Sequence, residues 1–124
     1  MEEKFIPLSV PNLSGNELEY ITQVVKKEWV STGGAEIEKF ENIFAKYVKK
    51  DLACAVQSGT AGLHLAMKLC GVEQGDEVIV PTLTFVAAVN PVKYCGAEPV
   101  FMDCDDYLCL DVDKVREFIE TECL

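Results

Sequence analysis

The chain has 124 residues, of which 49% are hydrophobic and 26% are charged, a composition typical of a folded globular domain and not of a disordered segment. Its 21 acidic and 11 basic residues give a formal net charge of −10, which would repel nucleic acid and anionic membrane surfaces and excludes both as partners. No apolar run has the length of a membrane span, and the acidic start lacks the features of a secretory signal, which favours a cytoplasmic protein.

The first predicted elements are two amphipathic helices. Ser14 and Glu17 have the spacing of a capping box, so a helix is expected to begin there, and its apolar stripe ends near Trp29. Two consecutive glycines then interrupt the pattern. A second apolar stripe predicts another helix over residues 37–48, whose aromatic side chains are explained by packing.

Residues 53–66 combine an apolar run, a small hydroxylated turn and an amphipathic pattern, as in a strand that leads into a helix. Ser58, Gly59, Thr60 and Ala61 form the predicted first turn. Unpaired N–H groups and the helix dipole enable such a turn to bind a phosphate. An ordinary N-cap at Ser58 is the alternative, and this segment taken alone favours the cap.

Two further apolar runs, residues 77–81 and 99–103, predict strands, and a helical pattern lies between them. That pattern covers residues 84–94, but Pro91 predicts a late helix start or a kink. Asp111 is expected to cap a last helix.

Strands that alternate with helices predict an α/β fold with three layers, in which helices flank a mainly parallel sheet. In such sheets ligands bind beyond the carboxyl ends of the strands. Residues 57–61 and 81–85 both fall at that end of the predicted sheet. The sequence therefore predicts a phosphate-binding turn beside the aromatic ring of Phe85.

The six cysteines fall mostly inside apolar stretches, which predicts small, reduced core residues. Cys104 and Cys109 are the nearest pair, but four residues separate them and no histidine lies nearby. No metal site is expected.

Four segments occur in order along nearly the whole chain: Val30-Ser-Thr-Gly, Gln57-Ser-Gly-Thr-Ala-Gly-Leu-His-Leu, Gly75-Asp-Glu-Val-Ile-Val-Pro-Thr-Leu-Thr-Phe and Gly96-Ala-Glu-Pro-Val-Phe-Met-Asp. In this combination the chain resembles the amino-terminal portion of the DegT-type (DegT/DnrJ/StrS) sugar aminotransferases. These are fold-type I enzymes that use pyridoxal 5′-phosphate (PLP) to aminate keto sugars linked to nucleotides. The resemblance implies a single partial domain, with an amino-terminal helical segment at residues 1–50 and the first part of the PLP-binding large domain at residues 51–124.

The resemblance also implies a cofactor site. Thr60 would bind the PLP phosphate through its hydroxyl and Ala61 through its backbone amide, while Gly59 would allow close approach. Phe85 would stack on the pyridine ring.

Three further residues match substrate-binding positions of the family. Thr32 and Gly33 match a loop that lies near the substrate in relatives. Asn90 matches a polar position on the helix after the stacking residue.

No catalytic residue is assigned to this chain. PLP chemistry needs a reactive lysine and an acid beside the pyridine nitrogen, and in relatives both lie well downstream of the matched segments. Lys68 and Lys93 are expected to be surface lysines, Asp103 a loop carboxylate and His64 a helix-packing residue. The chain alone is therefore expected to be inactive.

The complete enzyme is expected to transfer an amino group from glutamate to a UDP-linked 4-keto-6-deoxy sugar and to be a homo-oligomer, a homodimer in the simplest case. The sugar type is implied by residues 5–12, which resemble the subgroup that acts on such N-acetyl sugars. Two alternatives stay open. The chain could be a non-catalytic α/β module that binds a phosphorylated ligand or regulates a relative, or a truncated chain without a function of its own.

Overall fold

The computed structural model describes residues 5–31 and 34–122. Its internal contacts divide the chain into two compact units, Met1–Ala55 and Val56–Leu124. In the described part of the chain, no helix is both long enough and apolar enough to cross a membrane.

The first unit holds α1 (Glu17–Lys26) and α2 (Ala35–Tyr47). The predicted capping box is wrong, because the helix begins at Glu17 itself and the Ser14 hydroxyl donates to Asn12 Oδ1 at 2.7 Å instead. The helix also ends before Trp29. Glu28 has a φ of 55°, in the left-handed region, which a continuing helix cannot accommodate.

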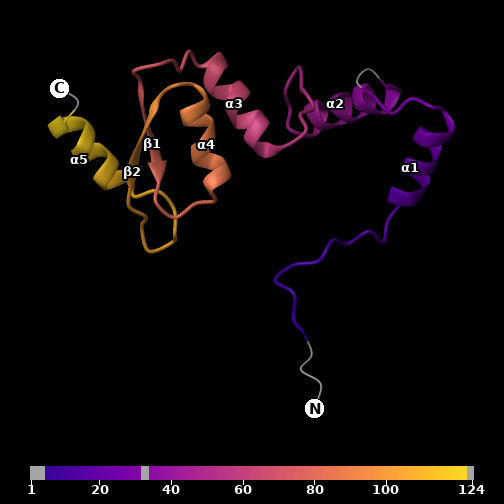
Figure 1. Ribbon diagram of the computed structural model, residues 1–124, viewed down its shortest axis with the longest axis horizontal. Coiled ribbons are helices and arrows are strands. Elements are labelled where there is room, and N and C mark those ends of the chain that lie inside the picture. The colour runs from indigo at the N-terminus through magenta and orange to yellow at the C-terminus, as the bar shows by residue number, and fades with distance from the viewer. Residues whose placement is uncertain (1–4, 32–33, 123–124) are drawn as a thin grey trace. The chain divides into compact units, whose positions relative to one another are not determined.

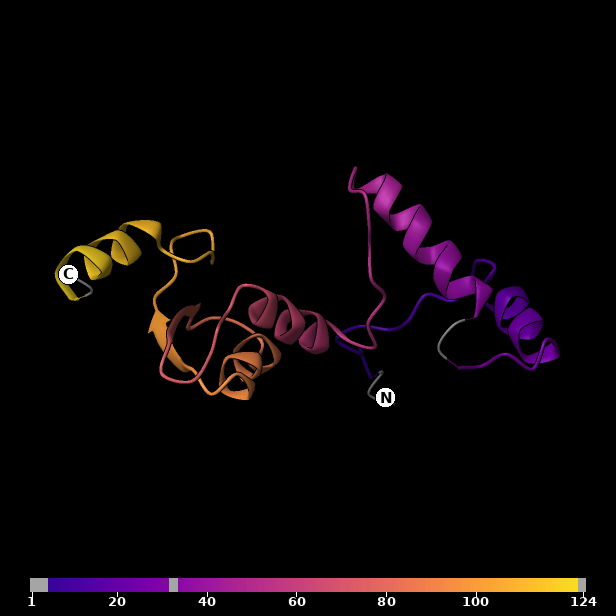
Figure 2. The same cartoon turned by 90° about the horizontal axis from the view of Figure 1, so that it is seen from above.

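An apolar groove of about 640 Å³ is lined by side chains of α1, of α2 and of the segment between them, including Val25, Trp29 and Phe40. Figures 1 and 2 both show the start of α2 next to α1. Most of the large hydrophobic side chains of this unit are exposed, and its described residues bury only Ala45. The two helices therefore share an apolar face that the unit itself does not cover.

The second unit contains α3 (Gly59–Leu69), β1 (Glu77–Pro81), α4 (Val86–Tyr94), β2 (Glu98–Met102) and α5 (Val112–Glu122). The two strands pair in parallel, with a register that runs from Glu77 opposite Glu98 to Pro81 opposite Met102. Parallel neighbours require a crossover, and α4 supplies it (Figure 1). This β1–α4–β2 unit confirms the expected α/β arrangement.

The core of the second unit lies between α4 and the strands. Val80, Val92 and Ala97 are buried, and partly buried apolar side chains from α3 and β1, among them Met67 and Val78, pack against them. Helix α3 packs on α4. The His64 ring meets the Tyr94 ring edge-on with 5.6 Å between centroids, as expected for a helix-packing residue.

Residues 53–57 do not form the predicted strand. A strand is defined by backbone bonds to a neighbour, and the sheet of the described residues has two strands, neither of which pairs with this segment. The Ala55 N–H instead donates to the carboxylate of Glu41 on α2, at 2.7 Å.

Helix α4 begins at Val86, after the first residues of its predicted range, and contains Pro91 in its interior. The late start is as expected, but Pro91 is still the sixth residue of the helix, where its missing N–H removes a backbone hydrogen bond. The cysteine prediction is wrong for most positions. Cys95 is the buried one among the cysteines of the described residues, whereas Cys54, Cys70 and Cys109 are exposed.

Candidate functional site

The candidate site lies at the carboxyl ends of β1 and β2. Because the strands are parallel, Pro81 and Met102 end at the same edge of the sheet. The loop after Pro81 leads into α4, and the loop after Met102 leads toward α5. Helix α3, which carries the predicted phosphate-binding turn, packs on α4 in the same unit.

The first turn of α3 has a formed N-cap. Ser58 is extended, with φ −162° and ψ 159°, and its side chain accepts a hydrogen bond from Ala61 N at 3.2 Å. Gly62 N donates to the Ser58 carbonyl at 3.1 Å. Since the first amides of a helix have no carbonyl partner within it, the N–H groups of Gly59 and Thr60 face outward from this turn. The capping alternative for Ser58 is confirmed, and two donors beside it stay open to a ligand.

Gly59 is exposed, and a Cβ added there would meet no other atom within 4 Å. Thr60 and Ala61 are half-buried. The turn is thus an open surface on the Gly59 side, where an anion can reach the backbone without displacing protein atoms.

Phe85 occupies the N-cap position of α4, and its carbonyl accepts from Ala88 N at 2.8 Å. Its side chain is 79% exposed, so the ring stands free of the core. At the other end of this loop, Thr82 bonds to the Met102 carbonyl twice, through its N–H at 2.8 Å and through its hydroxyl at 3.2 Å. The loop is therefore held at both ends, while the aromatic ring that it carries has a free face.

The remaining expected substrate residues are placed only in part. Asn90 lies half-buried on α4. Thr32 and Gly33 lie outside the described residues.

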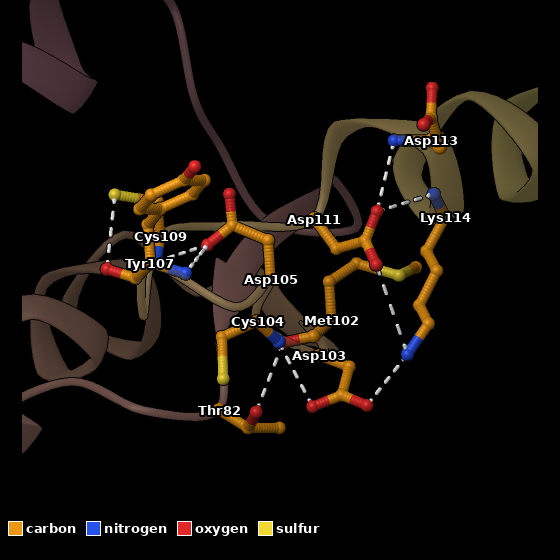
Figure 3. A network of polar contacts seen from close by, with 10 residues as sticks. All are labelled: Thr82, Met102, Asp103, Cys104, Asp105, Tyr107, Cys109, Asp111, Asp113 and Lys114. Atoms are coloured by element: carbon orange, nitrogen blue, oxygen red, sulfur yellow. Dashed lines mark hydrogen bonds and ion pairs between the residues drawn. The ribbon is translucent and has the colours of Figure 1, made fainter.

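The loop after β2 is ordered by aspartates, and apart from the Asp111 cap the sequence interpretation did not anticipate this network (Figure 3). Asp105 Oδ1 accepts from the backbone N–H groups of Tyr107 and Cys109, both at 2.9 Å. Asp111 caps α5, as predicted, by accepting from the N–H groups of Asp113 and Lys114 at 3.1 Å. The signal in the sequence is the spacing of the aspartates, since an Asp side chain readily bonds to backbone amides two residues on.

Lys114 on α5 joins this network to the end of β2. Its Nζ donates to Asp103 Oδ2 at 2.7 Å and lies 3.9 Å from Asp111 Oδ2. The hydrogen bond from Lys114, with a second from Cys104 N and the lysine's charge, lowers the pKa of Asp103 below its ordinary value. The same bond raises the pKa of Lys114. Asp103 is thus an exposed, paired loop carboxylate.

The lysines of the second unit lie on its surface. Lys68 and Lys93 are both exposed, and Lys93 pairs with Glu98 on β2. Across residues 5–31 and 34–122, no group of three or more His, Cys, Asp or Glu side chains is arranged to hold a metal ion.

A parallel βαβ unit with an exposed aromatic residue after its first strand, and a further helix packed on its crossover helix, places the chain in the class of α/β proteins. The particular family follows from sequence. Residues 11–123 match the DegT/DnrJ/EryC1/StrS aminotransferase family. The chain belongs to this family, and the resemblance is confirmed.

Two relatives illustrate the similarity. The chain is 48% identical over 103 residues to GDP-perosamine synthase from Escherichia coli O157:H7, a match that covers 83% of this chain and 28% of the relative. It is 35% identical over 120 residues to UDP-4-amino-4-deoxy-L-arabinose–oxoglutarate aminotransferase from Shewanella sediminis, with 96% of this chain and 31% of the relative covered. The chain thus spans about a third or less of the length of these relatives.

Among solved structures, the Spr1654 protein from Streptococcus pneumoniae in its PLP-form superimposes with a TM-score of 0.83 at 29% identity. The match covers 90% of this chain and 29% of that one. This likeness confirms the expected fold class, the α/β fold of the fold-type I PLP aminotransferases.

Proposed function

We propose that this chain forms the amino-terminal part of a PLP-dependent aminotransferase that transfers an amino group, with glutamate as the donor, to a nucleotide-linked 4-keto-6-deoxy sugar. The observation that carries the proposal is the family match over residues 11–123. Relatives named for a GDP-linked and a UDP-linked amino sugar support a nucleotide sugar as the acceptor. In the complete enzyme two copies are proposed to form a homodimer.

The residues of the second unit fit the phosphate of PLP. The outward N–H groups of Gly59 and Thr60, the Thr60 hydroxyl and the Ala61 amide, which Ser58 shares at 3.2 Å, supply donors in one helix turn. The positive end of the α3 dipole favours an anion there. Phe85, exposed at the start of α4, would stack on the ring and restrict its tilt.

When bound, PLP supplies an electron sink for amino-group transfer. The role proposed for residues 56–124 is to bind and orient the cofactor. Asn90 is proposed to contact the substrate, and the same role is proposed independently for Thr32 and Gly33. PLP chemistry also requires a reactive lysine and an acid beside the pyridine nitrogen. We propose that both correspond to the part of the relatives that this chain does not cover.

Equilibrium dialysis of the purified chain against PLP tests the cofactor site. We expect saturable binding with the absorption of a free aldehyde, weakened by Thr60→Val and by Phe85→Leu. Thr121→Val, on α5, and Tyr107→Leu, an aromatic that is 86% exposed, are the matched controls and should leave binding unchanged. Binding that none of the four substitutions alters would place PLP elsewhere and overturn the assignment.

The nucleotide linked to the sugar substrate has two candidates, UDP and GDP. The similarity of residues 5–12 to one subgroup favours UDP. The higher identity to the relative named GDP-perosamine synthase, 48% against 35%, favours GDP.

The fluorescence of Trp29 can show which nucleotide binds, because Trp29 is the single tryptophan of the chain and lies three residues before Thr32. Fluorescence titration with GDP and with UDP should show a saturable change for the preferred nucleotide at the lower concentration. No change with either nucleotide would argue against substrate roles for Thr32 and Gly33 in this chain.

A further inference from the structure

Thr82 directly follows the last residue pair of the parallel ladder. Its N–H donates to the Met102 carbonyl at 2.8 Å, one residue beyond the Pro81–Met102 pair. Its hydroxyl donates to the same carbonyl oxygen at 3.2 Å and is partly buried. A carbonyl oxygen has two lone pairs and can accept both bonds, of which Figure 3 draws the one from the hydroxyl.

The loop that begins at Thr82 has little else to hold it. Residues 82–86 are all exposed, with Leu83 at 54% and Phe85 at 79%. In the described part of the chain, the Thr82 hydroxyl is the one side-chain group of residues 82–85 that forms a hydrogen bond. At the far end, the Phe85 carbonyl accepts from Ala88 N, which fixes the first turn of α4. The direction in which Phe85 leaves the sheet thus depends on the anchor at Thr82.

We infer that Thr82 is a positioning residue for the cofactor ring: its hydroxyl holds the loop of residues 82–85 on the end of β2, so that Phe85 presents one face at a fixed angle. The inference rests on the proposed function, because it takes the ring of PLP as the partner of Phe85. Thr82 itself need not touch the cofactor. It acts through the backbone of three residues, and Met102, whose side chain is buried, supplies a rigid acceptor.

Thr82→Val removes the hydroxyl, keeps the side-chain shape and leaves Met102 O paired with the backbone N–H, so the unit should still fold. We expect the dissociation constant for PLP to rise about three- to tenfold, the range that one lost hydrogen bond gives, and the induced circular dichroism of bound PLP to fall. Thr82→Ser restores the hydroxyl and should restore both values. Thr84→Val, in the same loop, is the matched control.

A second readout does not depend on PLP. Nitrogen-15 relaxation of the amides of Leu83, Thr84 and Phe85 should show larger fast motions in Thr82→Val than in wild type or Thr82→Ser. Unchanged PLP binding in Thr82→Val would overturn the inference while leaving the proposed cofactor site intact. Failure of the Ser variant to rescue would also overturn it, because the methyl group and not the hydroxyl would then matter. If the wild-type chain binds no PLP, the proposed function of this site fails. The positioning role of Thr82 then fails with it, even if the relaxation data show larger motions of residues 83–85 in Thr82→Val.

Discussion

At the scale of single residues, Ser58 combines a structural and a functional assignment. Its side chain caps α3 through Ala61 N, an amide that is itself proposed to meet a phosphate together with the amides of Gly59 and Thr60 beside it. Local chemistry made the cap predictable from sequence, because it involves residues three positions apart. The bond between Asp103 and Lys114 was not predictable in this way, since it joins residues of different elements across a loop.

Replacing Ser58 by Ala should destabilise the second unit by about 1 kcal/mol, the typical cost of a lost N-cap. Urea unfolding followed by circular dichroism measures the change. Ser14→Ala is the control, because the Ser14 hydroxyl bonds to Asn12 and caps no helix. Equal stability of Ser58→Ala and wild type would mean that the cap contributes nothing.

The pairing of Asp103 with Lys114 has a pH dependence of known sign. The lowered pKa of Asp103 means that its contribution to stability is present above the ordinary carboxyl pKa of about 4 and is lost as the pH falls through the lowered value. The raised pKa of Lys114 means that its contribution is present below the ordinary lysine pKa and is lost as the pH rises through the raised value. Neutral pH lies inside both windows.

Lys114→Met should therefore raise the pKa of Asp103 toward its ordinary value. Carbon-13 NMR titration of the Asp103 carboxyl group measures this pKa directly. Arg116 lies on the same helix but pairs with Asp113. Arg116→Met therefore removes a cation of α5 without breaking the Asp103–Lys114 pair, and should leave the pKa of Asp103 unchanged. An Asp103 pKa that both variants shift equally would indicate a general charge effect and not the pair.

At the scale of elements, the helical stripes and the β1–α4–β2 unit were predictable because each follows from periodicity within a short segment. Residues 53–57 were predicted as a strand on the same grounds and are not one. Their apolar pattern is that of a strand, but a strand also needs a neighbouring strand to pair with. That neighbour is a property of the whole sheet and not of the segment. The carboxyl end of α1 was expected near Trp29 and lies at Lys26, because a left-handed residue such as Glu28 leaves no reliable signal in the sequence when it is not glycine.

The uncovered apolar face of α1 and α2 should cause self-association of the isolated chain. Ile21 is 62% exposed and lines the groove between the helices. Light scattering over a concentration series should show a mean mass above that of the monomer, and Ile21→Lys should lower it. Gln23→Lys adds the same charge on α1 outside the groove and should leave the mass unchanged; a monomer at all concentrations in wild type would contradict the prediction.

At the scale of the whole molecule, the family assignment depends on the order of several segments and not on any one turn. That order could be read from sequence, and the match over residues 11–123 confirms it. The full set of substrate contacts could not be predicted, because the chain covers 28% of one relative and 31% of the other.

The purified chain should show no transamination with glutamate and either a GDP- or a UDP-linked keto sugar. The physical reason is that Lys68 and Lys93 lie on the surface, and no lysine of the chain is assigned to the cofactor. Formation of 2-oxoglutarate measures turnover, with heat-treated protein as the baseline. Turnover above that baseline would show that a lysine of this chain performs the chemistry.

The β1–α4–β2 unit also bears on how the protein is made. Its two strands, its crossover helix and most of its core lie between Glu77 and Met102, but each strand pair, such as Glu77 opposite Glu98, joins residues 21 positions apart, so the contacts that close the sheet are not local. Parallel strand pairs of this kind form slowly, because the segment between the two strands must be closed before the pairing contributes any stability. On a ribosome, this parallel pair can form only after Met102 has left the exit tunnel, so until then β1 is without its partner strand.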